Sequence, residues 1–188
     1  MGGILHVCTA NQIRSPMAEL MMIARLKRRF GPAAESLLVT SAGLSATPGV
    51  PMQPLAIAEL SRRKIAAEGF TSTSLEPDMV GHAHLVLTAT RRQRDEIVAI
   101  VPDALHRTFA WREMAWLLQE TKPRDLPGSS LVERVINLSE LARRRRGYAP
   151  SIAPHLLDVA DPMGRPRSSY WRAARQIEAA VNATVGVL

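Results

Sequence analysis

The stretch VCTANQIRSP, residues 7–16, joins an apolar strand to a helix, and the interpretation of the whole chain starts from it. The apolar run at residues 4–7 predicts a buried strand. Pro16 opens an apolar pattern with helical spacing over residues 16–26, which predicts a helix. A short loop between a strand and a helix N-terminus can curl around an anion, because its backbone N–H groups and the helix dipole point to one place. The stretch therefore predicts an oxyanion-binding loop.

The side chains of this loop suit nucleophilic chemistry on such an anion. Cys8 ends the predicted strand, where the positive field of the helix N-terminus favours its thiolate, the nucleophilic form. Arg14 offers a planar fork to two phosphate oxygens. Asn11 tolerates left-handed backbone, and Ser15 either donates a hydrogen bond to the thiolate or caps the helix. Taken singly, Cys8 fits a small buried hydrophobe and Arg14 a surface residue. The prediction of a nucleophilic site depends on the occurrence of these residues together in one loop.

Predicted strands and helices alternate from residue 4 to about residue 120. The strand-like runs are residues 4–7, 37–41, 84–88 and 107–110. The helix-like segments are residues 16–26, 51–64, 91–101 and 112–119, and a last helix lies within 166–185. This alternation predicts right-handed crossovers and a parallel sheet covered on both faces. We therefore expect an α/β protein with a three-layer fold: a small central parallel sheet of about four strands, flanked by helices, with the phosphate loop after strand 1.

Residues 121–154 interrupt this alternation. The segment opens with a stretch that contains Pro and Gly, residues 123–128, and closes with a similar one, residues 147–150. Between them, residues 130–146 have the pattern of a helix. We expect one domain over residues 1–188, with 121–154 as an insertion or flap.

The composition narrows the class of protein. The 188 residues are 46% hydrophobic and contain one cysteine, and 24 Lys plus Arg against 17 Asp plus Glu give a net charge of +7. One cysteine excludes an intrachain disulfide and a zinc ribbon, and we expect a cytoplasmic protein whose thiol stays reduced. No apolar stretch approaches the roughly 20 residues that span a bilayer, and residues 1–7 do not resemble a signal peptide. The five histidines show no metal-ligand spacing, so no metal site is expected.

Arginine supplies 21 of the 24 basic residues, many of them in clusters at 25–29, 62–64, 91–94 and 143–146. We interpret these clusters as the solvated ends or faces of helices. Aromatic residues make up only 4% of the chain, which leaves few platforms on which bases could stack. We therefore do not expect nucleic acid as a partner, and nothing in the pattern indicates an oligomeric state.

Three motifs together resemble the low-molecular-weight protein tyrosine phosphatase family. Residues 8–16, CTANQIRSP, resemble the active-site loop of that family, which also follows its first strand. Ser41-Ala42-Gly43 resembles its Ser-Ala-Gly segment after the second strand. Residues 158–164, DVADPMG, resemble its late Asp-Pro segment. The resemblance covers residues 4 to about 118 and 155 to about 184.

The resemblance implies a phosphomonoester hydrolase of the protein-tyrosine-phosphatase type. It implies that Cys8 attacks phosphorus to form a phosphocysteine, while Arg14 stabilises the phosphoryl oxygens. Asp161 then protonates the leaving oxygen and later activates water. Substrate binding is implied for the other loop residues, Thr9, Ala10, Asn11, Gln12, Ile13 and Ser15. A supporting role is implied for Ser41, with a phosphorylated protein or a small aryl phosphate as substrate and no cofactor. Asp158 is the competing candidate for the acid, and we expect it to have a supporting role instead.

The sequence departs from the family pattern at three places. Ala10 stands where the family usually has Gly. Ile13 stands where it often has a second Cys, which can protect the nucleophile as a disulfide. Met and Gly at residues 163–164 follow the Asp-Pro pair, where tyrosine phosphatases often carry aromatics. Trp111 and Tyr148 can supply a ring wall instead, although we expect packing roles for both.

Two other functions fit the same loop. One is arsenate reduction, which uses a similar oxyanion loop; a single cysteine excludes the thioredoxin-coupled version, whereas a version with an external small thiol needs only Cys8. The other is a non-enzymatic module that binds oxyanions or nucleic acid with the loop and its basic faces.

Overall fold

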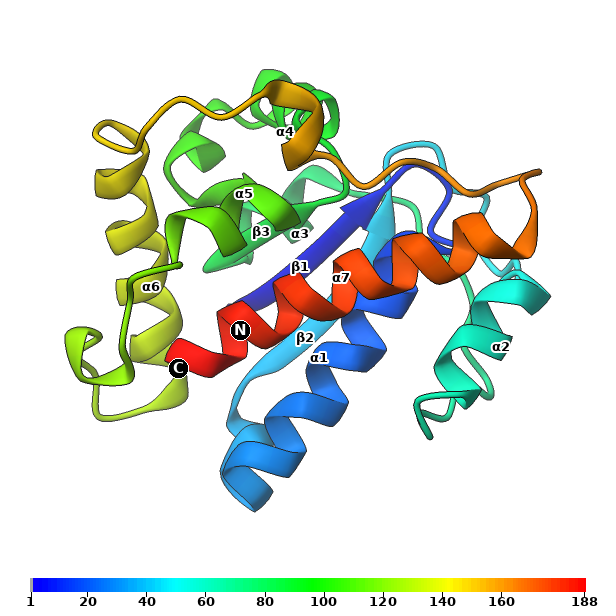
Figure 1. Ribbon diagram of the computed structural model, residues 1–188, viewed down its shortest axis with the longest axis horizontal. Coiled ribbons are helices and arrows are strands. Elements are labelled where there is room, and N and C mark those ends of the chain that lie inside the picture. Colours follow the sequence, from blue (N-terminus) through cyan, green and yellow to red (C-terminus); the bar gives the residue numbers. More distant parts are fainter. Residues whose placement is uncertain (1) are drawn as a thin grey trace.

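A central parallel sheet of four strands organises the protein (Figure 1). The computed structural model describes residues 2–188. In sheet order the strands are β2 (Leu38–Gly43), β1 (Gly3–Cys8), β3 (Leu85–Thr88) and β4 (Thr108–Ala110). Each neighbouring pair is parallel. All four strands overlap the predicted runs, so the predicted α/β class and parallel sheet are confirmed.

Seven α-helices surround the sheet within residues 2–188. Six of them overlap predicted helices, whereas α3 was missed because a helix of six residues is too short to show helical periodicity. The predicted helix at 51–64 is shorter in the structure, since Lys64 adopts a positive φ of 59° that no α-helix can continue through. The helices are α1 (Arg14–Phe30), α2 (Pro54–Ser61), α3 (Pro77–His82), α4 (Arg91–Ile100), α5 (Trp111–Leu117), α6 (Leu131–Arg146) and α7 (Arg167–Val187).

Strand β1 lies inside the sheet and is covered on both faces. Its six residues are all buried, as expected for a parallel strand between two helical layers. Ile4 and Cys8 belong to the larger apolar cluster, which also includes residues of α1 and α7. Leu5 and Val7 belong to a smaller cluster with residues of α3 and α4 on the opposite face. Figure 1 shows α1 and α7 side by side across one face of the sheet. The loop after β1 therefore emerges at the centre of the carboxyl edge of the sheet.

Helix α6 packs against the sheet at the side of β4. Ser130 caps its N-terminus by accepting a hydrogen bond from the Glu133 backbone N–H. Arg146, in its last turn, donates to the Thr108 carbonyl of β4 at 2.8 Å and to Glu113 at 2.9 Å. Its guanidinium also lies over the Phe109 ring, 4.1 Å from the ring centre. The basic run 143–146, interpreted from the sequence as a solvated helix end, therefore contributes its last arginine to covering the edge strand.

Two aromatic residues that were predicted to pack have different environments. Trp111 is buried, and its Nε1 donates to His6 Nδ1 at 2.9 Å. Tyr148 is 91% exposed, so the predicted packing role is wrong for this residue. Tyr148 follows the last turn of α6. In residues 2–188, no helix combines the length and the apolar character required to cross a bilayer.

Candidate active site

The loop after β1 takes the shape of an anion-binding turn. Cys8 is the last residue of β1, and α1 begins at Arg14. Asn11 has a φ of 53°, the left-handed conformation that the sequence analysis anticipated for it. Asn11 and Lys64 are the non-glycine residues of positive φ among residues 2–188. Ala10 is not one of them, so its methyl group causes no strain of this kind where the family has Gly.

The second strand supports the loop from one side. The Leu44 and Ser45 backbone N–H groups donate to the carbonyls of Cys8 and Thr9, both at 2.9 Å. Gly43 lies so close to the loop that a Cβ there would be 2.6 Å from the Thr9 carbonyl oxygen. The Ser-Ala-Gly segment thus requires its glycine for a close approach of two backbones.

A buried polar network lies beneath the loop and reaches the thiol. Ser15 Oγ lies 3.0 Å from Cys8 Sγ. Asn11 Nδ2 donates to Ser15 Oγ and to Ser41 Oγ, both at 2.8 Å, and Asn11 Oδ1 accepts from the Thr73 N–H at 2.8 Å. Ser15 Oγ accepts from Asn11, and its own proton has two acceptors within reach: Cys8 Sγ at 3.0 Å and the Ala42 carbonyl at 3.3 Å. Two roles were predicted for Ser15, contact with the thiol and capping of the helix. Helix α1 has no side-chain cap, so the structure contains the first of these roles.

Arg14 connects the loop to the segment before α7. Its guanidinium is buried and donates from Nη2 to Asp161 Oδ2 at 2.6 Å and from Nη1 to the Val159 carbonyl at 3.1 Å. A weaker contact of 3.4 Å joins Nη2 to Thr9 Oγ1. The Asp161 side chain is 47% exposed, so it bridges the buried arginine and the solvent. The structure thus brings Cys8, Arg14 and Asp161 to the same edge of the sheet.

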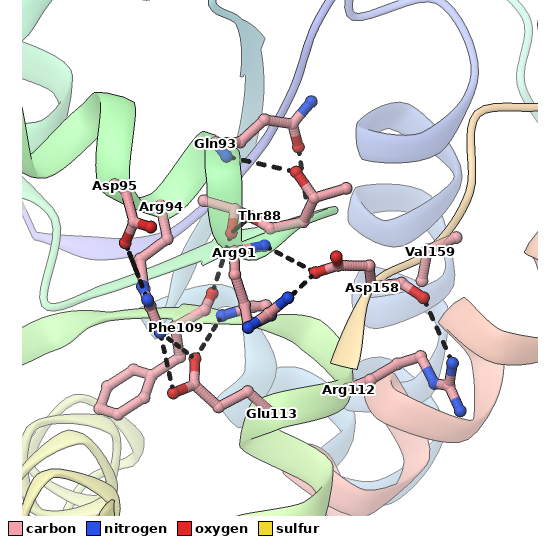
Figure 2. A network of polar contacts seen from close by, with 12 residues as sticks. Thr88, Arg91, Gln93, Arg94, Asp95, Phe109, Arg112, Glu113, Asp158 and Val159 are labelled. Atoms are coloured by element: carbon pink, nitrogen blue, oxygen red, sulfur yellow. Dashed lines mark hydrogen bonds and ion pairs between the residues drawn. The ribbon is translucent and has the colours of Figure 1, made fainter. Parts of the chain in front are cut away.

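Asp158 holds the segment that carries Asp161, and Figure 2 shows its contacts with Arg91 and Arg112. Its Oδ1 accepts from the Arg91 backbone N–H at 2.8 Å, at the start of α4. Its carbonyl accepts from Arg112 Nη1 at 3.2 Å, and the Val159 N–H donates to the Ala89 carbonyl at 2.8 Å. Asp158 therefore contacts α4 and α5 rather than the loop.

The remaining loop positions differ in accessibility. The Asn11 and Ser15 side chains are engaged in the network beneath the loop, and the Ile13 side chain belongs to the apolar core. The Thr9 side chain is exposed and accepts from Gln93 Nε2 at 2.9 Å. Gln12 is partly buried, and its Oε1 accepts from Gln53 Nε2 at 3.0 Å.

Several contact residues of the site were not identified from the sequence. Gln93 was interpreted as part of a solvated basic run, although its side chain also completes the capping box of α4 with Thr90. The Thr73 N–H and the Val159 carbonyl are backbone groups, which leave no residue-type signal. A capping-box pattern at Thr90 and Gln93 was the one available signal.

Two titratable groups near the site have shifted pKa values. Burial lowers the pKa of His6, two residues before the cysteine, to about 3. Burial and the negative charge of Asp161 raise the pKa of Tyr170. Within residues 2–188 no group of three or more His, Cys, Asp or Glu side chains is arranged to hold a metal ion. The site thus offers a thiol, an anion-binding loop, a guanidinium and a carboxylate.

Comparison with known proteins places this arrangement in a family. The sequence profile of the low molecular weight phosphotyrosine protein phosphatases matches residues 3–120. The protein-tyrosine-phosphatase Wzb of Escherichia coli K12 is 32% identical over 100 residues, which are 53% of this chain and 63% of Wzb. The match thus spans less than two thirds of that relative. The protein-arginine-phosphatase of Geobacillus stearothermophilus is 34% identical over 110 residues, 58% of this chain and 69% of the relative.

Solved structures agree over nearly the whole chain. The YwlE arginine phosphatase from Geobacillus stearothermophilus superposes with a TM-score of 0.66 at 25% identity, covering 98% of this chain and 91% of that one. Wzb of Vibrio vulnificus, in complex with benzylphosphonate, superposes with a TM-score of 0.70 at 19% identity. This match covers 100% of this chain and 99% of that one. Profile, sequence relatives and fold agree, and the chain belongs to the low molecular weight phosphotyrosine protein phosphatase family.

Proposed function

We propose that this protein hydrolyses phosphomonoesters through a phosphocysteine on Cys8. The observation that supports this most is the convergence of three groups: Cys8 at the loop, Arg14 beside it, and Asp161 at 2.6 Å from Arg14. In the first step a bond forms between Sγ and phosphorus, and the bond between phosphorus and the leaving oxygen breaks. Asp161 gives its proton to that oxygen. In the second step Asp161 takes a proton from water, whose oxygen attacks phosphorus and releases Cys8.

The loop holds the phosphoryl group with its backbone and with Arg14. Asn11, Ile13 and Ser15 are buried, so we assign their contribution to backbone N–H groups. The Thr9, Ala10 and Gln12 N–H groups belong to the same turn. Bound phosphate needs the Arg14 guanidinium, which now binds Asp161, so Asp161 leaves Arg14 when substrate enters and faces the leaving oxygen as the protonated acid, with a proton taken from solvent. Ser15 stabilises the thiolate, Asn11 and Ser41 hold Ser15, and Asp158 supports the Asp161 segment.

The substrate class we propose is a phosphorylated protein, with aryl phosphates as small substitutes. Named relatives act on phosphotyrosine or on phosphoarginine in proteins. Phosphoarginine is a second candidate because Met163, not an aromatic, lies exposed next to the Asp-Pro pair. Trp111 is buried and Tyr148 lines a separate hollow with Trp116 and Leu117, so neither supplies a ring wall beside Asp161.

We also propose how the chain is organised and where it acts. The family profile ends at residue 120, and residues 121–154 follow as a segment added to one domain. A cytoplasmic location suits the mechanism, because the single cysteine acts as a thiolate and a reducing compartment keeps it available.

Turnover of p-nitrophenyl phosphate tests the proposal. The wild type should hydrolyse it, and Cys8→Ser should reduce turnover to the background rate while inorganic phosphate still binds. Matched peptides with phosphotyrosine or phosphoarginine then identify the preferred residue. Undiminished turnover by Cys8→Ser, or thiol-dependent arsenate reduction without phosphatase activity, would contradict the proposal.

A further inference from the structure

A groove outside the candidate active site runs along α7. Its larger part, with a volume of about 480 Å³, lies between α5, α7 and the chain near residues 152–157. Its smaller part, about 240 Å³, lies between α7 and the segment that carries Asp161. Arg172 and Gln176 line both parts. The two hollows therefore adjoin, and one end of the combined surface lies at the expected general acid.

The floor of the larger part presents apolar side chains to solvent. Trp171 is 44% exposed and Leu156 is 41% exposed, and Trp116 lies in the same lining. Arg175 places its guanidinium over the Trp171 ring, 5.0 Å from the ring centre. Exposed large apolar side chains that gather in one hollow commonly mark a binding surface.

The charge of the groove is one-sided. Four arginines line it: Arg112, Arg165, Arg172 and Arg175. Across residues 2–188 none of these four forms an ion pair with a carboxylate. Among the described residues that line the two hollows, Asp161 is the one carboxylate, and it binds Arg14. The arginines at the end of α6 differ, because Arg143, Arg144 and Arg146 pair with Glu140 or Glu113.

We propose that this groove binds an acidic segment of the phosphoprotein substrate, close in sequence to the phosphorylated residue. Carboxylates of that segment contact Arg172 and Arg175, and an apolar residue packs against Trp171 and Leu156. This inference rests on the proposed phosphatase function, since it assigns a sequence preference to the surface beside the same site. The positive charge of the groove indicates an acidic occupant. Because Asp161 lies at one end of the groove, this acidic segment is close in sequence to the phosphorylated residue.

Two peptides and two double variants test the inference. The phosphopeptides share length and phosphotyrosine, and one has Asp and Glu around an apolar residue where the other has Ser and Gly. The groove variant is Arg172→Glu with Arg175→Glu, both exposed on α7. The control is Lys27→Glu with Arg28→Glu, which makes the same charge change at the far end of α1, where both side chains are exposed.

The wild type should prefer the acidic peptide. The groove variant should raise KM for that peptide about tenfold, with kcat and the neutral peptide little changed, because exposed charges contribute modestly to binding. Hydrolysis of p-nitrophenyl phosphate should stay at the wild-type rate in both double variants. Equal kcat/KM for the two peptides in the wild type, or an equal loss in the control, would overturn the inference.

A binding measurement separates this inference from the phosphatase proposal. Fluorescence anisotropy with labelled acidic phosphopeptide and the Cys8→Ser protein requires no turnover. Binding that weakens on adding Arg172→Glu and Arg175→Glu supports the groove even if no phosphate ester is hydrolysed. Binding that stays unchanged overturns the groove even if hydrolysis occurs.

Discussion

At the scale of single residues, Asp161 binds Arg14 in the structure, and we propose that it faces the leaving oxygen once substrate binds. Asp161→Asn removes the proton that the leaving group receives. We expect kcat for phenyl phosphate, a poor leaving group, to fall about 100-fold, the lower range for general acid catalysis. The fall for p-nitrophenyl phosphate should be smaller, since its anion leaves more readily. The ratio of the two kcat values measures the effect.

Asp158→Asn is the matched control. Asparagine keeps an oxygen that can accept from the Arg91 N–H, and the carbonyl that binds Arg112 is untouched. Turnover should change little and equally for both esters. A leaving-group dependence in Asp158→Asn, and none in Asp161→Asn, would show that the acid has been misassigned.

A second prediction at the scale of single residues concerns His6 and the stability of the protein against unfolding. Its pKa is about 3 in the folded protein because of burial, and about 6.5 in an unfolded chain. The unfolded state therefore binds more protons between these values. The contribution of His6 to the free energy of unfolding is complete above about pH 6.5. It falls as the pH drops, by about 1.4 kcal/mol per pH unit, until about pH 3.

Urea unfolding at a series of pH values measures this slope. His6→Phe should lower the number of protons taken up on unfolding by about one in that pH window. Trp111→Phe is the control, because it loses the hydrogen bond to His6 Nδ1 but keeps the buried imidazole. An identical pH dependence in His6→Phe and the wild type would contradict the assignment.

At the scale of elements, the end of β2 sets the shape of the loop. A Cβ at residue 43 would lie 2.6 Å from the Thr9 oxygen and 2.8 Å from the Asn11 nitrogen. Gly43→Ala should therefore displace the loop and lower kcat about 100-fold, the cost of a shift near 1 Å in a catalytic site. Gly81→Ala is the control, since a Cβ there meets no atom within 4 Å among the described residues. Equal activity of the two variants would count against the close approach.

Helix α6 depends on one buried carboxylate for its attachment. Glu113 is 5% exposed and accepts from Arg94, from Arg146 and from the Ala110 N–H. Glu113→Gln leaves the partly buried Arg146 without a counter-charge and leaves Arg94 with Asp95 alone, and we expect a loss of about 2 kcal/mol in unfolding free energy. Glu140→Gln, which removes the carboxylate partner of Arg143 and Arg144 at the surface of α6, should change the unfolding midpoint much less. Equal midpoints for both variants would contradict the anchoring role.

At the scale of the whole molecule, local patterns predicted the elements well and their contacts less well. The strand, turn and helix around Cys8 follow from residues 4–26, because apolar periodicity and Pro16 are local signals. The contact between Arg14 and Asp161 joins residues 147 positions apart. The family resemblance indicated that both residues act at one site, but it did not predict this contact. Such a contact depends on the packing of α7 beside α1, which no local pattern specifies.

The groove along α7 also arises from contacts between residues far apart in the sequence. Its arginines are dispersed at residues 112, 165, 172 and 175, so the sequence does not display them as a cluster. Three of the four basic runs that the sequence does display, at residues 62–64, 91–94 and 143–146, pair with carboxylates in the fold. Which arginines keep an unpaired charge, and so favour acidic partners, is therefore visible only after folding.

The central claim is that Cys8 carries the phosphoryl group. Rapid acid quenching of the wild type during turnover of p-nitrophenyl phosphate, followed by peptide mass spectrometry, tests it directly. We predict the added mass of one phosphoryl group on the peptide that contains Cys8, and none in Cys8→Ala, which has no nucleophile at this position, under the same conditions. Full turnover in Cys8→Ser, or a phosphoryl group on another residue that forms and decays at the rate of turnover, would contradict the account.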